Sequence, residues 1–344
     1  MHLYIFSFLS FLITCILLNC AKNINFFNKY LKTNDEFVFT SKKKLYTSIS
    51  AIRGVGIFFL VTFILLTLII TIDHDIETPN RFFFFLLALA ILSILSFYDD
   101  FRSIDPRLRL VLHLICVYIA TSTLQLNLVP LPFKVSILFA IVIWVYLINV
   151  TNFIDGSDGF CTINVISFYV GVLILSTSYQ LYSFYIAIIL LPILFAFLIF
   201  NMPNAKLFMG DSGSIFLGFL LGYSFLEIAI LINPFYSIIL FIYPLADCSI
   251  TLFKKCILKG HAPWARHGDY YFLGPKKRIS ANKRKKVSLM ILKVIISFSI
   301  LNLVLFYLEI KFKNNYLFII NLFSTLLVLW IYENNLFTKN YNRK

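Results

Sequence analysis

Residues 208–232, FMGDSGSIFLGFLLGYSFLEIAILI, place a glycine-flanked aspartate directly before a long, almost uninterrupted apolar run. A helix needs roughly 17 to 25 apolar residues to cross the hydrocarbon core of a membrane, and the run over 214–232 meets that length. Charge is costly within such a helix, so Asp211 marks a place where the chain returns to a polar environment. The stretch therefore predicts a transmembrane helix that begins beside a polar site.

The whole chain shares this apolar character. Its 344 residues are 60% hydrophobic, 18% aromatic and only 13% charged, and the mean hydropathy is +0.87. Soluble domains keep roughly a quarter of their residues charged, so this chain has too few polar side chains to cover a surface exposed to water. We predict an all-α integral membrane fold. Residues 1–344 would form one polytopic domain, a bundle of about 10–11 transmembrane helices.

Apolar runs of suitable length are spread along the chain. They are 3–21, 55–72, 82–98, 108–129, 133–150, 160–176, 183–201, 214–232, 235–253, 287–308 and 316–333. The first run lacks the basic residues that open a signal peptide, so we expect it to be retained as a true span.

Basic residues are distributed unevenly between the loops that join these runs. Lys and Arg number 30 against 16 Asp and Glu, which gives a net charge of +14. If the N-terminus lies outside, the inner loops hold 25 of the basic residues and the outer loops hold 4. Basic residues collect on the cytoplasmic side of membrane proteins, so the asymmetry sets the orientation and explains the charge without a nucleic-acid partner. A basic inner face also suits anionic lipids and anionic cytosolic substrates.

Acidic residues gather in three short segments on the predicted inner side, each at the end of a different apolar run. They are Asp99, Asp100, Asp155, Asp158 and Asp211. Several carboxylates together imply a divalent cation, raised pKa values or separation by solvent. Oxygen ligands without clustered His or Cys favour Mg²⁺, which takes one or two protein oxygens together with substrate phosphate. The three segments therefore predict a site for phosphoryl chemistry.

Glycine accompanies these acids in 155–159 (DGSDG) and 210–213 (GDSG). Such loops let backbone N–H groups approach an anion closely, and the following helix presents its N-terminus there. Taken singly, an Asp-Gly pair is an ordinary turn and an Asp at a helix start is an N-cap. The occurrence of all three segments on one side favours the functional interpretation.

Two longer motifs carry a resemblance to a known family. Residues 149–159, NVTNFIDGSDG, resemble Asn-x-x-Asn-x-x-Asp-Gly-x-Asp-Gly, and residues 201–214, NMPNAKLFMGDSGS, resemble Asn-x-Pro-x-Ala-x-x-Phe-Met-Gly-Asp-x-Gly-Ser. Together with RGVG at 53–56, they are similar to the polyprenyl-phosphate N-acetylhexosamine-1-phosphate transferases, glycosyltransferase family 4. The match covers about residues 50–275, and 276–344 adds a basic loop and two C-terminal spans. The residues that follow Asp99 and Asp100 resemble the branch that initiates O-antigen and related surface glycans.

The resemblance implies an activity and its setting. A UDP-N-acetylhexosamine would donate its sugar 1-phosphate to polyprenyl (undecaprenyl) phosphate, releasing UMP. The product would be the lipid-linked diphosphosugar that starts a cell-envelope glycan such as lipopolysaccharide O-antigen. The reaction would need Mg²⁺, with Mn²⁺ as a substitute. The implied location is the bacterial inner (plasma) membrane, where the multi-pass chain contacts membrane lipid and has its active site in the cytoplasm. Family members often form homodimers.

The resemblance also implies roles for individual residues. Asp211 and Asn152 would bind Mg²⁺, while Asp99, with Asp100 beside it, would deprotonate or orient the lipid phosphate as the catalytic pair. Phe208 would stack on uracil, and Asn201 and Asp158 would hydrogen-bond the uridine. The full set expected to bind the nucleotide sugar is Asp155, Asp158, Asn201, Phe208, Arg266 and His267.

The loop over 260–271, GHAPWARHGDYY, departs from the family pattern. The family usually carries His-Arg-x-His followed by Tyr-Gln there, whereas this chain has one Arg and two His at other spacings. Arg266 and His267 are the residues we expect to bind the diphosphate. The alternative is a solvated basic connector.

Three further polar residues in apolar runs have two interpretations each. Asp247 either supports the site or is simply paired. Glu227, which has no evident partner in the sequence, is expected to form a hydrogen bond between helices. His113 is expected to be a satisfied helix residue rather than a ligand.

Other functions remain as alternatives to this transferase. One is the activity of the phospho-MurNAc-pentapeptide translocases in the same family. Another, from a different class, is a proton-coupled secondary transporter, whose site should lie near the membrane midplane on broken helices. The acids of this chain collect at one predicted face instead.

Overall fold

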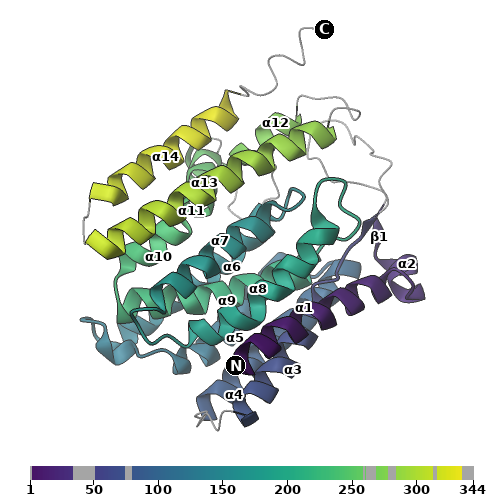
Figure 1. The fold of residues 1–344 in the computed structure, drawn as a ribbon, viewed down its shortest axis with the longest axis horizontal. Coiled ribbons are helices and arrows are strands. Elements are labelled where there is room, and N and C mark those ends of the chain that lie inside the picture. Colours follow the sequence, from purple (N-terminus) through teal and green to yellow (C-terminus); the bar gives the residue numbers. More distant parts are fainter. Residues whose placement is uncertain are drawn as a thin grey trace.

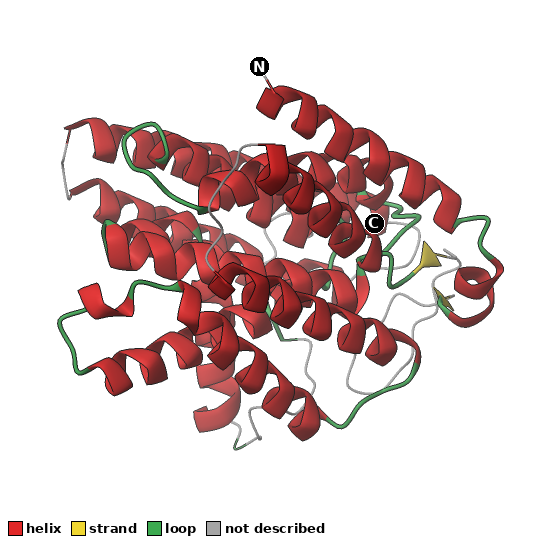
Figure 2. Ribbon diagram, turned by 90° about the horizontal axis from the view of Figure 1, so that it is seen from below, coloured by secondary structure: helices red, strands yellow, loops and turns green. Residues whose placement is uncertain are grey.

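The computed structural model describes residues 2–33, 51–73, 80–258, 260, 269–277, 284–312 and 316–334. The principal helices are α1 (His2–Ala21), α3 (Ile57–Asp73), α4 (Asn80–Phe101), α5 (Pro106–Ala120), α6 (Phe133–Ile154), α7 (Phe160–Leu175), α8 (Ser183–Asn201), α9 (Gly210–Leu231), α10 (Pro234–Leu240), α11 (Ile242–Phe253), α13 (Arg284–Phe312) and α14 (Tyr316–Glu333). Short α2 (Asn25–Tyr30) and α12 (Gly274–Lys277) join them. The predicted all-α membrane bundle is confirmed, and Figure 2 shows how little of the described chain is strand.

Every predicted apolar run coincides with helical structure. Six of the helices in the described ranges are long and apolar enough to cross a membrane on their own, and a seventh candidate is the pair α10 and α11, bent by 83°. Three further apolar helices, within α3, α7 and α14, have 17 residues or fewer in their apolar part.

The run over 108–129 is the clearest departure from the prediction. Its α-helix, α5, ends at Ala120, and two 3₁₀ turns, Thr121–Thr123 and Leu126–Leu128, follow. The single long span predicted there is wrong, because hydropathy records apolar content and does not register where the helix ends.

Helix α9 forms the centre of the bundle. It packs against α6 and α4, and nearly all of its residues from Ser212 to Ile228 are buried. A helix that is apolar on all sides is stable only when other helices surround it. Figure 1 shows α13 and α14 along one edge of the bundle and α1, α3 and α4 along the opposite edge, with α9 between them.

Glycines allow α9 and α6 to approach each other closely. A methyl group on Gly218 would lie 2.7 Å from the Cα of Ile148, and one on Gly222 would overlap the indole of Trp144. Small residues let membrane helices pack backbone against backbone. Trp144 donates its indole N–H to the carbonyl of Phe219 at 2.8 Å, so the contact is polar as well as close.

Glu227 caps a neighbouring helix near the far end of α9. Its carboxylate accepts hydrogen bonds from the backbone N–H groups of Tyr182, at 2.8 Å, and Ser183, at 2.9 Å, at the start of α8. The predicted hydrogen bond between helices is confirmed. A carboxylate is well suited to this position, because helix N-terminal N–H groups otherwise have no partner.

A small strand pair lies at the end of the bundle where α9 begins. Strand β1 (Lys32–Thr33) pairs antiparallel with β2 (Ala51–Ile52), and Ile52 also bridges Leu207 in parallel. The N–H of Gly56 then bonds the carbonyl of Met209 at 3.0 Å. A methyl group on Gly56 would lie 2.1 Å from Gly213. These contacts fix the start of α3 against the start of α9. They thereby position Arg53, which follows β2 and precedes α3 in the sequence.

Candidate active site

A carboxylate from α4 caps the N-terminus of α9. The side chain of Asp100 accepts hydrogen bonds from the N–H groups of Asp211, at 2.8 Å, and Ser212, at 3.1 Å. Gly210 lies beside it with φ of 72°, and a methyl group there would come within 2.5 Å of the Asp100 carboxylate. The glycine of the 210–213 motif is therefore needed on two counts, the left-handed backbone and the close approach.

Arg53 forms ion pairs with two of the three acidic segments, those of Asp100 and Asp211. Its Nε lies 3.0 Å from the carboxylate of Asp100, and its Nη2 lies 2.7 Å from that of Asp211. The Asp100 side chain is fully buried and that of Asp211 is 16% exposed. Buried carboxylates need such partners, because an unpaired charge away from water is strongly unfavourable.

Arg109 makes the matching bridge from the first turn of α5. Its Nη1 lies 3.1 Å from Asp99 and 3.1 Å from Asp211. Helix α5 is oriented for this contact by Asp105, whose side chain accepts the N–H groups of Arg107 and Leu108 as an N-cap. Asp211 thus lies between two guanidinium groups.

Asn152 completes the cluster from the last turn of α6. Its amide Nδ2 lies 3.4 Å from Asp211 and donates to the Ser214 hydroxyl at 2.8 Å. The structure therefore brings together Asp99, Asp100, Asn152 and Asp211, which come from three separate parts of the sequence. The catalytic and metal-binding roles of these four residues remain predictions.

Asp155 lies next to this cluster, just beyond the end of α6. Burial raises the pKa of its carboxyl well above the usual range. Arg53 opposes that rise, and the carboxylates of Asp211, Asp100 and Asp158 add to it. Acidic side chains thus outnumber the arginines that face them, and the site can accept further positive charge.

The donor set of this cluster fits Mg²⁺ in part. No group of three His, Cys, Asp or Glu side chains is arranged to hold a metal within the described ranges. Mg²⁺ commonly binds through one or two protein oxygens while substrate phosphate and water supply the rest. The partly exposed carboxylate of Asp211 and the side-chain oxygen of Asn152 could supply that contribution.

Asn201 and Asp158 tie two loops of the site together. The Asn201 carbonyl oxygen accepts the N–H of Gly159 at 2.8 Å, and its amide donates to the carbonyl of Leu207 at 3.0 Å. Asp158 accepts the N–H of Asn204 at 3.2 Å. Both side chains are buried. They hold the loop that precedes α7 against the loop that precedes α9, and their contacts with uridine remain predictions.

Three nucleotide-sugar candidates remain, and the structure describes one of them. Phe208 is half-buried and lies two residues before the start of α9. Arg266 and His267 lie outside the described residues, so their predicted contact with the diphosphate is not tested.

Asp247 of α11 anchors the segment that contains Tyr271 and Phe272. This buried carboxylate accepts the N–H groups of Tyr271, at 2.9 Å, and Phe272, at 3.2 Å, and the hydroxyl of Tyr243 at 2.9 Å. Phe272 stacks on Phe160 at the start of α7, with ring centroids 4.3 Å apart. Asp247 is therefore paired, and its pairing also holds the chain after residue 268 against the loop that carries Asp155 and Asp158.

Sequence reasoning gave no role to the two arginines at the centre of the cluster. Arg53 entered the sequence interpretation only as part of the RGVG motif, and Arg109 only as one of the basic residues counted on the inner loops. Their position in the sequence could have indicated a role. Each is a basic residue at the start of an apolar run, on the same predicted side of the membrane as the acidic segments.

Asp155 leads to a prediction about pH. The unfolded carboxyl has a pKa of about 3.9, and the folded one has a higher pKa. Between those pKa values the native state binds more protons than the unfolded state, so stability falls as pH rises through the folded pKa. We expect Asp155→Asn, which stays neutral, to raise the melting temperature at neutral pH and to flatten its decline above about pH 4. Thermal unfolding of the detergent-solubilised protein across pH measures this, and an unchanged pH profile would contradict it.

Comparison with known proteins confirms the resemblance. Residues 82–229 match the model of Glycosyl transferase family 4, a narrower range than the predicted 50–275. The phospho-N-acetylmuramoyl-pentapeptide-transferase of Streptococcus sanguinis is 28% identical over 183 residues, 47% of this chain and 55% of that protein. The undecaprenyl-phosphate alpha-N-acetylglucosaminyl 1-phosphate transferase of Thermotoga maritima is 28% identical over 214 residues, 62% of this chain and 60% of that protein. The matched regions thus span little more than half the length of these relatives.

Proposed function

Since residues 82–229 of this chain match glycosyl transferase family 4, we propose that the protein transfers an N-acetylhexosamine 1-phosphate from a UDP-sugar to polyprenyl phosphate. The observation that supports this most is the Asp211 cluster, in which carboxylates from α4 and α9 meet Asn152 of α6 and two arginines. Charged groups of both signs at the end of a membrane bundle suit a reaction between two anions.

The proposed reaction exchanges one phosphoanhydride partner for another. A phosphate oxygen of the lipid attacks the β-phosphorus of the UDP-sugar, and the bond from that phosphorus to the bridging oxygen of the α-phosphate breaks. UMP leaves, and the lipid carries the new diphosphosugar. Bound Mg²⁺, or Mn²⁺ in its place, would neutralise charge on the diphosphate.

The residues of the cluster divide this work. Asp99 orients the lipid phosphate and accepts its proton when one is present. Arg109 uses only Nη1 for its two ion pairs, and its side chain is 26% exposed, so its other N–H groups can face a phosphate. Arg53 uses Nε and Nη2 in its ion pairs, and its side chain is 35% exposed, so its Nη1 can also face a phosphate. Guanidinium groups suit this task because their N–H geometry matches phosphate oxygens.

The proposal extends to location and pathway. The excess of basic residues on one set of loops supports a cytoplasmic site in a bacterial inner membrane. The product would start an O-antigen-like envelope glycan. A second candidate is transfer of phospho-MurNAc-pentapeptide, which the name of the Streptococcus sanguinis relative supports.

Release of UMP from defined substrates tests the proposal. Membranes that contain the full chain are incubated with undecaprenyl phosphate, Mg²⁺ and a panel of UDP-N-acetylhexosamines that includes UDP-MurNAc-pentapeptide. We expect UMP and a lipid-linked product with at least one donor, and no product once EDTA removes the metal. The donor that reacts separates the two candidates. If no donor reacts and the chain instead accumulates a solute in sealed vesicles, the transporter alternative replaces the proposal.

A further inference from the structure

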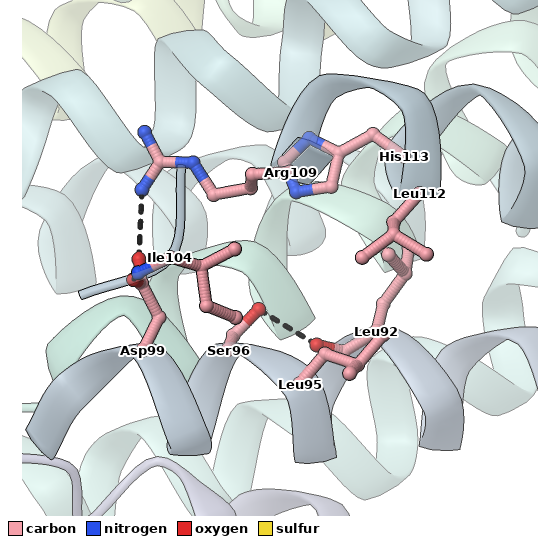
Figure 3. Close-up of a pocket in the computed structure, with 8 residues that line it drawn as sticks. All are labelled: Leu92, Leu95, Ser96, Asp99, Ile104, Arg109, Leu112 and His113. Atoms are coloured by element: carbon pink, nitrogen blue, oxygen red, sulfur yellow. Dashed lines mark hydrogen bonds and ion pairs between the residues drawn. The ribbon is translucent and has the colours of Figure 1, made fainter. Parts of the chain in front are cut away.

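A small pocket lies between α4 and α5, beside the proposed catalytic residue. Figure 3 shows Asp99, Ser96, Arg109 and His113 around it, together with three leucines and Ile104. The space is large enough for about one water molecule. Asp99 and His113 lie at opposite ends of this lining, and most of the side chains between them are apolar.

His113 has no hydrogen-bond partner for either ring nitrogen within the described residues. The residue is only 3% exposed. An imidazole always carries at least one N–H donor, and its neutral form also carries one acceptor. Buried polar groups of this kind nearly always have a hydrogen-bond partner. The expectation that His113 is a satisfied helix residue is therefore wrong, since no described protein group forms a hydrogen bond with its ring. Its partner has to come from another source.

The other polar groups of the pocket can supply the rest of a water's coordination. Ser96 donates its hydroxyl hydrogen to the carbonyl of Leu92 at 2.6 Å, so its oxygen lone pairs remain able to accept. Asp99 accepts from the N–H of Ile104 and from Arg109, and a carboxylate has room for further donors. A buried water needs two to four such partners, and these three side chains are the uncommitted polar groups in the lining of the pocket.

We propose that the pocket holds one ordered water that links His113 to Asp99, and that His113 is through this link a positioning residue for Asp99. His113 lies one helical turn beyond Arg109 on the same helix, so α5 presents to Asp99 both a direct ion pair and a water-mediated contact. With both contacts in place, the Asp99 carboxylate is held from two directions. This second step rests on the proposed function, whereas the presence of the water does not.

The water itself can be detected without any assay of activity. Four other histidines, His2, His74, His261 and His267, are replaced by Gln in the full chain, so that ¹⁵N-histidine labelling reports His113 alone. In lipid nanodiscs we expect transfer of magnetisation from water to the His113 ring, and a changed ring ¹⁵N shift after Asp99→Asn. Absence of that transfer means a dry pocket and overturns the inference, even if the transferase activity is present.

The positioning role is tested by rate. His113→Leu should lower kcat between about tenfold and a hundredfold, because a small misplacement of a catalytic group has effects of that order. The KM for the UDP-sugar should stay within twofold, and the melting temperature should not fall. His113→Gln, which keeps a donor and an acceptor, should recover most of the rate.

Cys116→Ala, one turn further along α5, is the matched control. Wild-type kcat in His113→Leu overturns the positioning role. If water transfer is seen but no donor reacts in the wild type, the proposed function fails and the water site stands.

Discussion

Asp211→Asn is expected to abolish UMP release, with a loss of at least about 10³-fold in kcat, or roughly 4 kcal/mol of transition-state stabilisation. The Asp211 carboxylate accepts from Arg53 at 2.7 Å and from Arg109 at 3.1 Å. An asparagine would remove the charge that pairs with both guanidinium groups and would turn an N–H₂ group toward one of them. It would also weaken the site proposed for Mg²⁺, which prefers carboxylate oxygen.

The matched control is Asp105→Asn. Asp105 is an exposed N-cap on the adjacent helix α5, and asparagine caps helices about as well as aspartate does. We expect this variant to keep wild-type rates. Steady-state UMP release, measured at several Mg²⁺ concentrations, compares the two variants. Full activity of Asp211→Asn at ordinary Mg²⁺ would refute its assignment as a metal ligand, and recovery only at high Mg²⁺ would support it.

Asp100→Ala is expected to be the most destabilising change in the cluster, by about 3–5 kcal/mol, the usual cost of removing one partner of a buried ion pair. The Asp100 side chain is fully buried, pairs with Arg53, and caps the first N–H groups of α9. The alanine variant leaves the N-terminus of the central helix without its acceptor and leaves one contact of Arg53 unmade. The melting temperature of the purified protein should fall by several degrees.

The neighbouring residue supplies the contrast. Asp99 is also mostly buried, but it accepts from Ile104 and pairs with Arg109, whereas the first N–H groups of α9 are accepted by Asp100. We expect Asp99→Ala to lose most of its activity with a smaller fall in melting temperature. If Asp100→Ala instead keeps the wild-type melting temperature and is inactive, then Asp100 takes part in the chemistry directly, as the family resemblance implies for the pair.

The adjacent pair shows how far sequence interpretation could reach. Two consecutive aspartates at the end of an apolar run predict a polar site, and the motif predicts a catalytic pair. Successive residues on a helix point about 100° apart, so the two carboxylates face different neighbours. One reaches α9 and the other faces the pocket beside α5. The surrounding helices determine which carboxylate caps α9 and which faces the pocket, and the motif alone does not predict this.

Asn201 and Asp158 illustrate the same limit in the loops. Both belong to motifs that the sequence analysis connected with uridine, and both form hydrogen bonds to backbone groups of the other loop. A motif records that a residue type is required at a position. It does not distinguish a residue that binds the ligand from one that shapes the loop around it.

The sequence by itself determined that this chain is a bundle of membrane helices and where its polar segments lie, because apolar length and the cost of charge in hydrocarbon are local properties of the chain. Only the tertiary structure decided how the charges pair. Arg53 is 158 residues from Asp211 in the sequence, and Arg109 is 102 residues from it. A buried carboxylate is stable only beside a compensating charge or donor. The arrangement of α3, α4, α5 and α9 around that carboxylate selects which of the 30 basic residues fill this role.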